Sequence, residues 1–78
     1  MSTASSHIAA RRIELQLDTR PHAVPAGTTL AELVAQQGHP PEAVGTALNG
    51  SFVPRAQRPC RVLREGDAVL LFQPFVGG

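Results

Sequence analysis

The residues best suited to carry chemistry are the last two of the chain, Gly77 and Gly78. Glycine lacks a Cβ, so a Gly-Gly end adopts backbone conformations and enters narrow channels that exclude other residues. We therefore expect the carboxylate of Gly78 to be the working group, on a flexible tail that includes Gly77 and Val76. A carboxylate is a poor electrophile, so it must first be converted to an acyl phosphate anhydride. A chance Gly-Gly end is the alternative, with a frequency of about one in a hundred from composition.

Cys60 is the other candidate reactive group. No histidine near it in sequence supplies a base, and cysteine is among the residues most often buried and inert, so we expect an ordinary thiol. The three histidines, His7, His22 and His39, share no ligand spacing with Cys60 or with one another. We therefore predict no metal site.

Phe72 and Phe75 flank the start of the tail and are candidates for partner binding, because aromatic residues are enriched in interface cores. For Phe75 we favour contact with a partner, whereas for Phe72 we favour a place in the core. Arg55 begins a group of arginines spaced three residues apart, which ends at Arg64. This spacing matches neither a strand nor a long helix face. Arg55 and its group could steer an acidic partner, but a solvated face is the favoured interpretation.

The composition limits the class of protein. A chain of 78 residues holds one core at most, and its 42% hydrophobic and 17% charged residues are typical of a globular domain. A formal net charge of +1 offers no basic stripe for a phosphate backbone, so we expect no nucleic-acid partner. The single cysteine fits a reducing compartment. No run approaches the about 20 apolar residues of a membrane span, and no secretory signal is present, so we expect a cytoplasmic protein without a membrane partner.

The elements that must position these groups begin with a hairpin and a helix. Apolar and polar residues alternate over 13–17, which indicates a half-buried strand, and residues 22–24 are its expected partner. A capping-box pattern of Thr29 and Glu32 then opens a helix of about nine residues, which Gly38 ends.

The second half of the chain is predicted to add three strands. Residues 44–48 and 51–53 flank Asn49-Gly50, the strongest short signal for a hairpin. After a turn at Glu65-Gly66-Asp67, residues 68–72 form a continuous apolar run. Such a run indicates a strand that is buried on both faces and central in its sheet.

The predicted order is strand, strand, helix, strand, short strand, strand, which is the order of the ubiquitin-like β-grasp. The fold class is therefore α+β, with a mixed sheet of four to five strands packed on one main helix. We expect a disordered leader at residues 1–7, the β-grasp domain at 8–73, and the flexible Gly-Gly tail at 74–78.

Several short motifs occur in an order that is more specific than any one of them. In chain order they are Gly27-Thr28-Thr29, Glu32-Leu33, Asn49, Val53-Pro54-Arg55, Glu65-Gly66-Asp67, Leu70-Leu71-Phe72-Gln73 and Gly77-Gly78. Together they resemble the ThiS family, the sulfur carriers of thiamine biosynthesis, from about residue 13 to the end of the chain. Pro74 and Phe75 depart from the family pattern and lean toward the related small subunit of molybdopterin synthase, MoaD.

The resemblance implies a carrier that partner enzymes act on, not an enzyme. A ubiquitin-activating-like adenylyltransferase, ThiF-like, would use ATP to adenylate Gly78, and a cysteine-derived sulfur donor would displace AMP. The resulting thiocarboxylate would deliver sulfur to a thiazole synthase, ThiG-like. The carrier would bind no cofactor of its own, because the activating enzyme uses the ATP.

Three alternative functions remain open. The first is the small subunit of molybdopterin synthase, which would be a permanent partner rather than a transient carrier. The second is a ubiquitin-like modifier, in which the activated carboxylate forms an isopeptide bond with another protein. The third is a non-catalytic β-grasp module for protein binding, for which loss of Gly78 would leave function intact.

Overall fold

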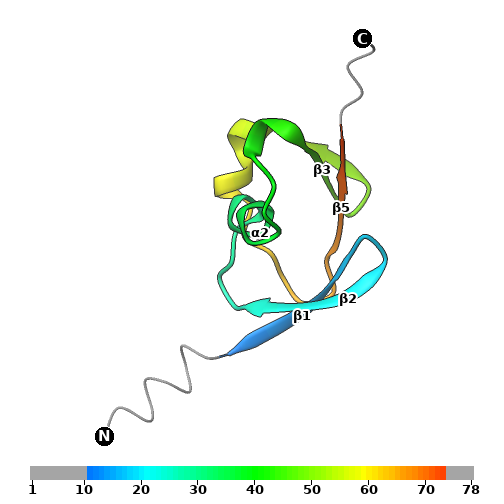
Figure 1. Ribbon diagram of the computed structural model, residues 1–78. Coiled ribbons are helices and arrows are strands. Elements are labelled where there is room, and N and C mark those ends of the chain that lie inside the picture. The colour runs from blue at the N-terminus through cyan, green and yellow to red at the C-terminus, as the bar shows by residue number, and fades with distance from the viewer. Residues whose placement is uncertain (1–10, 74–78) are drawn as a thin grey trace, which may run out of the picture.

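The computed structural model describes residues 11–73, which form a layer of strands with a helix on one side (Figure 1). The predicted leader at 1–7, residues 8–10 of the predicted domain and the tail at 74–78 lie outside the described residues. Within residues 11–73, no helix is long and apolar enough to cross a membrane.

The first two strands form the hairpin that the alternating pattern predicts. β1 (Arg12–Leu17) and β2 (Arg20–Pro25) pair antiparallel along their whole length. Asp18 and Thr19 join them with φ angles of 51° and 70°. These left-handed conformations are the ones that a two-residue type I′ turn requires. Because the pairing continues up to this tight turn, β2 is longer than the predicted residues 22–24.

The helix begins at the predicted capping box. α2 (Leu30–Gln36) follows Thr29, whose Oγ1 accepts from the Glu32 N–H at 3.1 Å. The Glu32 Oε1 in turn accepts from the Thr29 N–H at 2.9 Å. The two side chains therefore satisfy two backbone donors that the first turn leaves unpaired. The helix has seven residues, fewer than predicted, and Gly38 follows it in the left-handed conformation with φ of 81°.

A second hairpin follows the short 3₁₀ helix η1 (Pro41–Ala43). Its strands are β3 (Gly45–Leu48) and β4 (Ser51–Val53), which pair antiparallel. Asn49 and Gly50 connect them with φ angles of 52° and 86°. Positive φ at both positions confirms the predicted Asn-Gly turn.

Two of the four arginines spaced three apart, Arg55 and Arg58, lie in a 3₁₀ helix, η2 (Arg55–Cys60). A 3₁₀ helix has three residues per turn, so a spacing of three fits this helix, but the two side chains lie in different surroundings. Arg58 is only 4% exposed, whereas Arg55 is exposed. The predicted solvated face is therefore wrong for Arg58, whose guanidinium packs against backbone carbonyl oxygens inside the protein.

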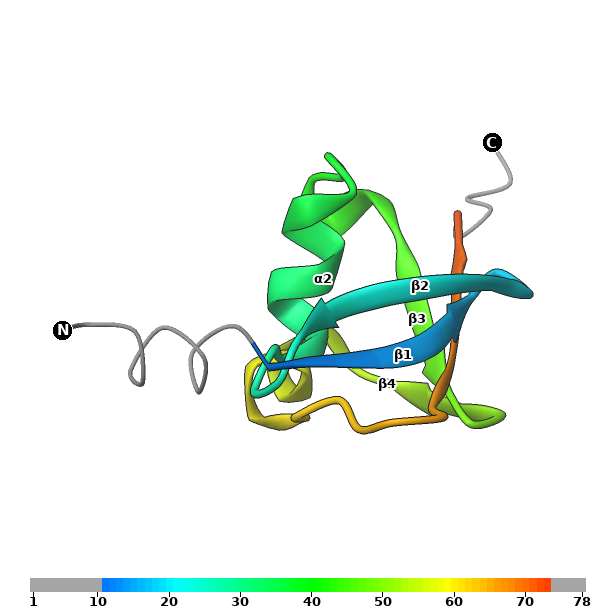
Figure 2. The same ribbon diagram turned by 90° about the horizontal axis from the view of Figure 1, so that it is seen from below.

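The last strand is central, as predicted. β5 (Ala68–Phe72) lies in a five-stranded sheet of order β2-β1-β5-β3-β4. It runs parallel to β1 and antiparallel to β3. With α2 packed on one side of the strands, this is the predicted ubiquitin-like β-grasp of the α+β class (Figure 2).

The core lies between α2 and one face of the sheet. Its buried side chains are aliphatic, and they are Leu15, Leu17, Val24, Leu30, Leu33, Val53, Leu63 and Val69. The other face of β5 is open, so the prediction that this strand is buried on both faces is wrong: Val69 is 2% exposed and Leu70 is 49% exposed. Successive strand residues point to opposite faces, and the one main helix covers only the inner face.

Candidate functional site

The candidate site is the end of β5, because this strand leads into the predicted tail. β1 accompanies β5 over two residue pairs only, the second of which is Leu17 with Val69. β3 continues alongside β5 as far as Phe72, which lies opposite Gly45. The last residues of β5 therefore extend beyond the end of β1 while β3 still holds them in the sheet.

Asp18 completes the hydrogen bonding of β5 where β1 ends. The Asp18 N–H donates to the Val69 carbonyl oxygen at 2.9 Å. The Leu71 N–H donates to the Asp18 Oδ1, also at 2.9 Å. A carboxylate acceptor makes this second bond stronger than a neutral one. The Asp18 side chain therefore takes the place of the next residue of a longer β1 strand.

Asn49 and Asp67, which belong to two separate sequence motifs, meet at the start of β5. The Asn49 Nδ2 donates to the Asp67 Oδ1 at 3.1 Å, and the Asn49 Oδ1 accepts from the Ala68 N–H at 2.9 Å. The Asp67 Oδ2 accepts from the Arg64 N–H at 2.8 Å. These bonds tie the β3–β4 turn to the entry of β5, so the strand is fixed at both ends.

The outer face of the sheet carries exposed apolar side chains next to this strand end. Phe52 is 63% exposed, Leu70 49% and Phe72 38%, and we call these three residues the outer apolar patch. Ala47 lies between them in the register, opposite both Phe52 and Leu70. Large exposed aromatic residues near one another are typical of a surface that a partner covers.

Phe72 belongs to this patch and not to the core, which corrects the favoured prediction for it. Its ring lies over Gly45, where an added Cβ would collide with it. The ring centroids of Phe52 and Phe72 are 6.4 Å apart with an interplanar angle of 46°. This separation is within the range of favourable aromatic pairs, about 4.5 to 7 Å.

The predicted site residues do not all come together. Arg55 begins η2 and lines a cleft with Val34 of α2 and Pro41 of η1, whereas Phe72 is exposed on the outer face of the sheet. Gly78, Gly77, Val76 and Phe75 lie outside the described residues. The roles proposed for these four residues therefore stay predictions.

Sequence reasoning missed Phe52 and Leu70 as surface residues. The available signal was the strict alternation within each strand. Phe52 is adjacent to the buried Val53, and Leu70 is adjacent to the buried Val69, so each must point outward. In an apolar run such as residues 68–72, composition alone cannot assign the two faces.

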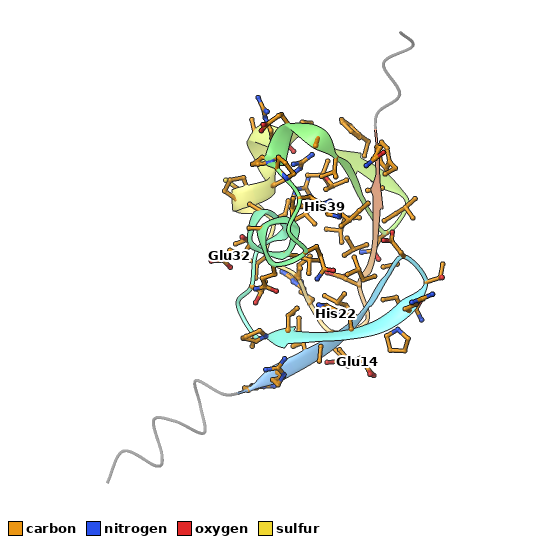
Figure 3. The ribbon with its side chains drawn as sticks, viewed as in Figure 1. Glu14, His22, Glu32 and His39 are labelled. Carbon is orange, nitrogen blue, oxygen red and sulfur yellow. The ribbon has the colours of Figure 1, made fainter. Side chains whose placement is uncertain are left out.

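The described residues show no second chemical centre. No group of three His, Cys, Asp or Glu residues within residues 11–73 could hold a metal ion. Figure 3 shows Glu14, His22, Glu32 and His39 on separate elements, without convergence on a common point. Cys60 is an exposed free thiol at the end of η2.

Comparison with known proteins identifies relatives of this chain. A model of the ThiS family matches residues 7–78. The chain is 38% identical to the sulfur carrier protein ThiS of Escherichia coli strain K12 over 53 residues, which cover 68% of this chain and 80% of that protein. Its fold is similar to the crystal structure of the thiamine biosynthesis protein ThiS from Geobacter metallireducens. That comparison has a TM-score of 0.74 and 26% sequence identity, and it covers 85% of this chain and 100% of the other.

Proposed function

The chain belongs to the ThiS family, and we propose that it is a sulfur carrier of thiamine biosynthesis whose working group is the carboxylate of Gly78. The observation that carries this proposal is the family match over residues 7–78, because it includes the Gly-Gly end. The E. coli relative is a sulfur carrier protein. A carrier of this kind is a substrate of its partner enzymes and performs no catalysis itself.

The proposed cycle begins with activation of the carboxylate by a ThiF-like adenylyltransferase. A Gly78 carboxylate oxygen attacks the α-phosphorus of ATP, pyrophosphate leaves, and an acyl adenylate forms. A cysteine-derived persulfide then attacks the carbonyl carbon and AMP leaves. A thiol cleaves the S–S bond of this acyl disulfide and is oxidised to a mixed disulfide, which leaves a thiocarboxylate on Gly78. We propose a ThiG-like thiazole synthase as the recipient of the sulfur.

The arrangement of β5 supports this role in a physical way. The strand is hydrogen-bonded on both sides and fixed by Asp18 and Asn49, so its end is held in a defined position. A partner that binds the outer apolar patch would thereby also fix the point from which the tail extends. Accurate placement of a reacting carboxylate is what a near-attack geometry requires.

Intact-mass analysis tests the chemistry. The protein is incubated with a cognate activating enzyme, ATP, a cysteine-dependent sulfur source and a thiol. The expected product carries one sulfur in place of one oxygen, on the C-terminal peptide. Without ATP no change is expected. The activating enzyme is first shown to modify its own carrier protein. If the present protein then stays unmodified, the carrier proposal is overturned.

Two variants of the tail provide the matched controls. Deletion of Gly77 and Gly78 should leave stability within about 0.5 kcal/mol of wild type, because the core described within residues 11–73 keeps all its side chains. The same deletion should abolish adenylation. An extra Ala after Gly78 displaces the carboxylate by up to about 3.5 Å and should be almost as damaging. Normal adenylation of either variant would contradict the role proposed for the Gly78 carboxylate.

The recipient is tested separately, because Pro74 and Phe75 lean toward the molybdopterin pathway. The thiocarboxylated protein is mixed in parallel with a thiazole synthase and with the large subunit of molybdopterin synthase. Transfer of sulfur only in the first reaction supports the thiamine assignment. A stable complex and transfer only in the second reaction assign the chain to molybdopterin synthesis. Isopeptide products with other proteins would indicate a modifier.

A further inference from the structure

A second surface, distinct from the outer apolar patch, lies where η1 and η2 pack against α2. It is a cleft of about 190 Å³. Its lining residues are Ala31, Val34, Pro41, Arg55, Arg58 and Pro59. Four of these six residues are apolar, and the other two carry positive charge. The cleft is therefore an apolar pocket with a cationic edge.

Arg58 places a buried positive charge directly beside this cleft. Its Nε donates to the Thr46 Oγ1 at 3.1 Å, its Nη1 to the Pro41 carbonyl oxygen at 2.9 Å and its Nη2 to the Val44 carbonyl oxygen at 2.6 Å. All three acceptors are neutral. These bonds satisfy the guanidinium nitrogens but do not cancel their charge.

Arg55 adds a second positive charge one 3₁₀ turn earlier, and it is exposed. Burial, and then repulsion from Arg55, lower the pKa of the Arg58 guanidinium from its ordinary value. Arginine nevertheless stays charged in proteins, so both groups contribute to the local potential. Apolar walls beside the charges weaken the screening of this potential by water.

The size of the cleft restricts what it can hold. Sites that enclose a drug-sized ligand typically measure about 300 to 1,000 Å³. At about 190 Å³ this cleft is too small for a nucleotide such as ATP, but it suits a single apolar side chain. Pockets that accept one anchoring side chain are typical centres of protein interfaces.

We propose that this cleft docks an acidic segment of a partner protein, with one aliphatic side chain seated between α2 and η2 and a neighbouring carboxylate paired with Arg55. The apolar walls of the cleft favour the aliphatic side chain, and its positive charge favours the carboxylate. The cleft lies where η1 and η2 meet α2. The helix α2 covers one face of the sheet (Figure 1), whereas Leu70 and Phe72 are exposed on the other face. One partner can therefore hold the protein here while another covers the outer apolar patch.

Short blocked peptides test this proposal through backbone amide chemical shifts of the ¹⁵N-labelled protein. The three probes are Glu-Leu-Glu, Glu-Ser-Glu and Lys-Leu-Lys, each acetylated and amidated. Glu-Leu-Glu should shift the amides of Ala31, Val34 and Arg58 and bind most tightly. Glu-Ser-Glu lacks the apolar anchor and Lys-Leu-Lys has the wrong charge, so both should bind at least about threefold more weakly.

Two charge reversals at exposed arginines distinguish a charge pair within the cleft from a general effect of the protein's net charge. Arg55→Glu should weaken Glu-Leu-Glu binding by about three- to tenfold, since an attractive pair becomes repulsive. Arg20→Glu makes the same change on β2 and should leave the affinity within about twofold. Ala31→Leu, which fills the cleft from α2, should also weaken binding.

Three results would overturn the docking proposal. The first is equal binding of all three peptides, and the second is an equal loss from Arg20→Glu and Arg55→Glu. The third is a set of shifts centred on Phe52 and Leu70 in place of the cleft. Sedimentation without peptide distinguishes another occupant: concentration-dependent dimerisation that Arg55→Glu abolishes would mean that a second copy of this chain fills the cleft.

Discussion

The two faces of β5 differ although they come from one apolar run. Val69 points inward and is buried against the core, whereas its neighbour Leu70 points outward and is half exposed. The inner residue contributes to stability through burial, and the outer residue contributes little to it. The apolar residues of this strand therefore have two separate roles. Those on the inner face pack in the core, and those on the outer face, as we propose, contact a partner.

The largest expected effect is the loss of folding on the inner face. Val69→Asp places a carboxylate in the core without a partner, at a cost of several kcal/mol against a total stability of about 5 to 15 kcal/mol. We expect the variant to be unfolded or to melt far below wild type, as measured by circular dichroism. A cooperative transition near that of wild type would mean that the inner face of β5 is not buried.

The second-largest loss of stability is expected in η2, where one arginine is buried and the other is exposed, as Val69 and Leu70 are in β5. Arg58→Ala removes the donor to Thr46 and to two backbone carbonyl oxygens, and it leaves a cavity. We expect a loss of about 2 to 4 kcal/mol in the free energy of unfolding, measured by urea denaturation. Arg55→Ala should cost no more than about 0.5 kcal/mol. Equal losses for the two variants would contradict the buried role of Arg58.

An intermediate effect is expected at the turn that carries Phe52 to the outer face. Gly50 has a φ of 86°, a conformation that a β-branched residue resists. Gly50→Val should therefore destabilise by about 1 to 2 kcal/mol in thermal or urea unfolding. No atom beyond the glycine and its chain neighbours lies within 4 Å of a Cβ placed at Gly50, so the expected loss comes from the backbone conformation. Unchanged stability would show that this turn tolerates another conformation.

Among the strand variants, the smaller effect on stability is expected on the outer face of β5, where a loss of partner binding is expected as well. Leu70→Asp should cost roughly 0.5 to 1 kcal/mol, because its side chain is already half exposed. The same variant should weaken binding to the activating enzyme, since it introduces a charge into the outer apolar patch. Calorimetric titration against that enzyme measures the loss. Wild-type affinity would remove Leu70 from the proposed interface.

Local patterns were sufficient to predict most of the fold. The capping box at Thr29 and the Asn49-Gly50 turn each depend on hydrogen bonds or φ angles set within a few residues. Alternation predicted β1, and the order of elements predicted the β-grasp. These features could be inferred because the relevant physics is local.

The features that the sequence did not predict depend on tertiary contacts. Leu70 would be covered only if a second layer packed on the outer face of the sheet. No local sequence pattern predicts how many layers pack on a sheet. Arg58 is buried because carbonyl oxygens from η1 and the residue before β3 converge on it. Similarly, Asn49 and Asp67 read as separate turn residues in the sequence, and only the fold brings them within hydrogen-bond distance. The sequence therefore predicted that β5 is the strand that leads to the chain end, but not which side chains form the surface beside it.

The parallel pairing of β1 with β5 has a consequence for the speed and order of folding. It joins the first described strand to the last, and the bond between Leu71 and Asp18 spans 53 residues. Closing so long a loop has an entropic cost that must be met before the contact stabilises anything. The hairpin of β1 and β2 and the hairpin of β3 and β4 can each form locally, within microseconds. Closure of the sheet must wait for β5, so a nascent chain cannot complete this domain until its last strand has been synthesised.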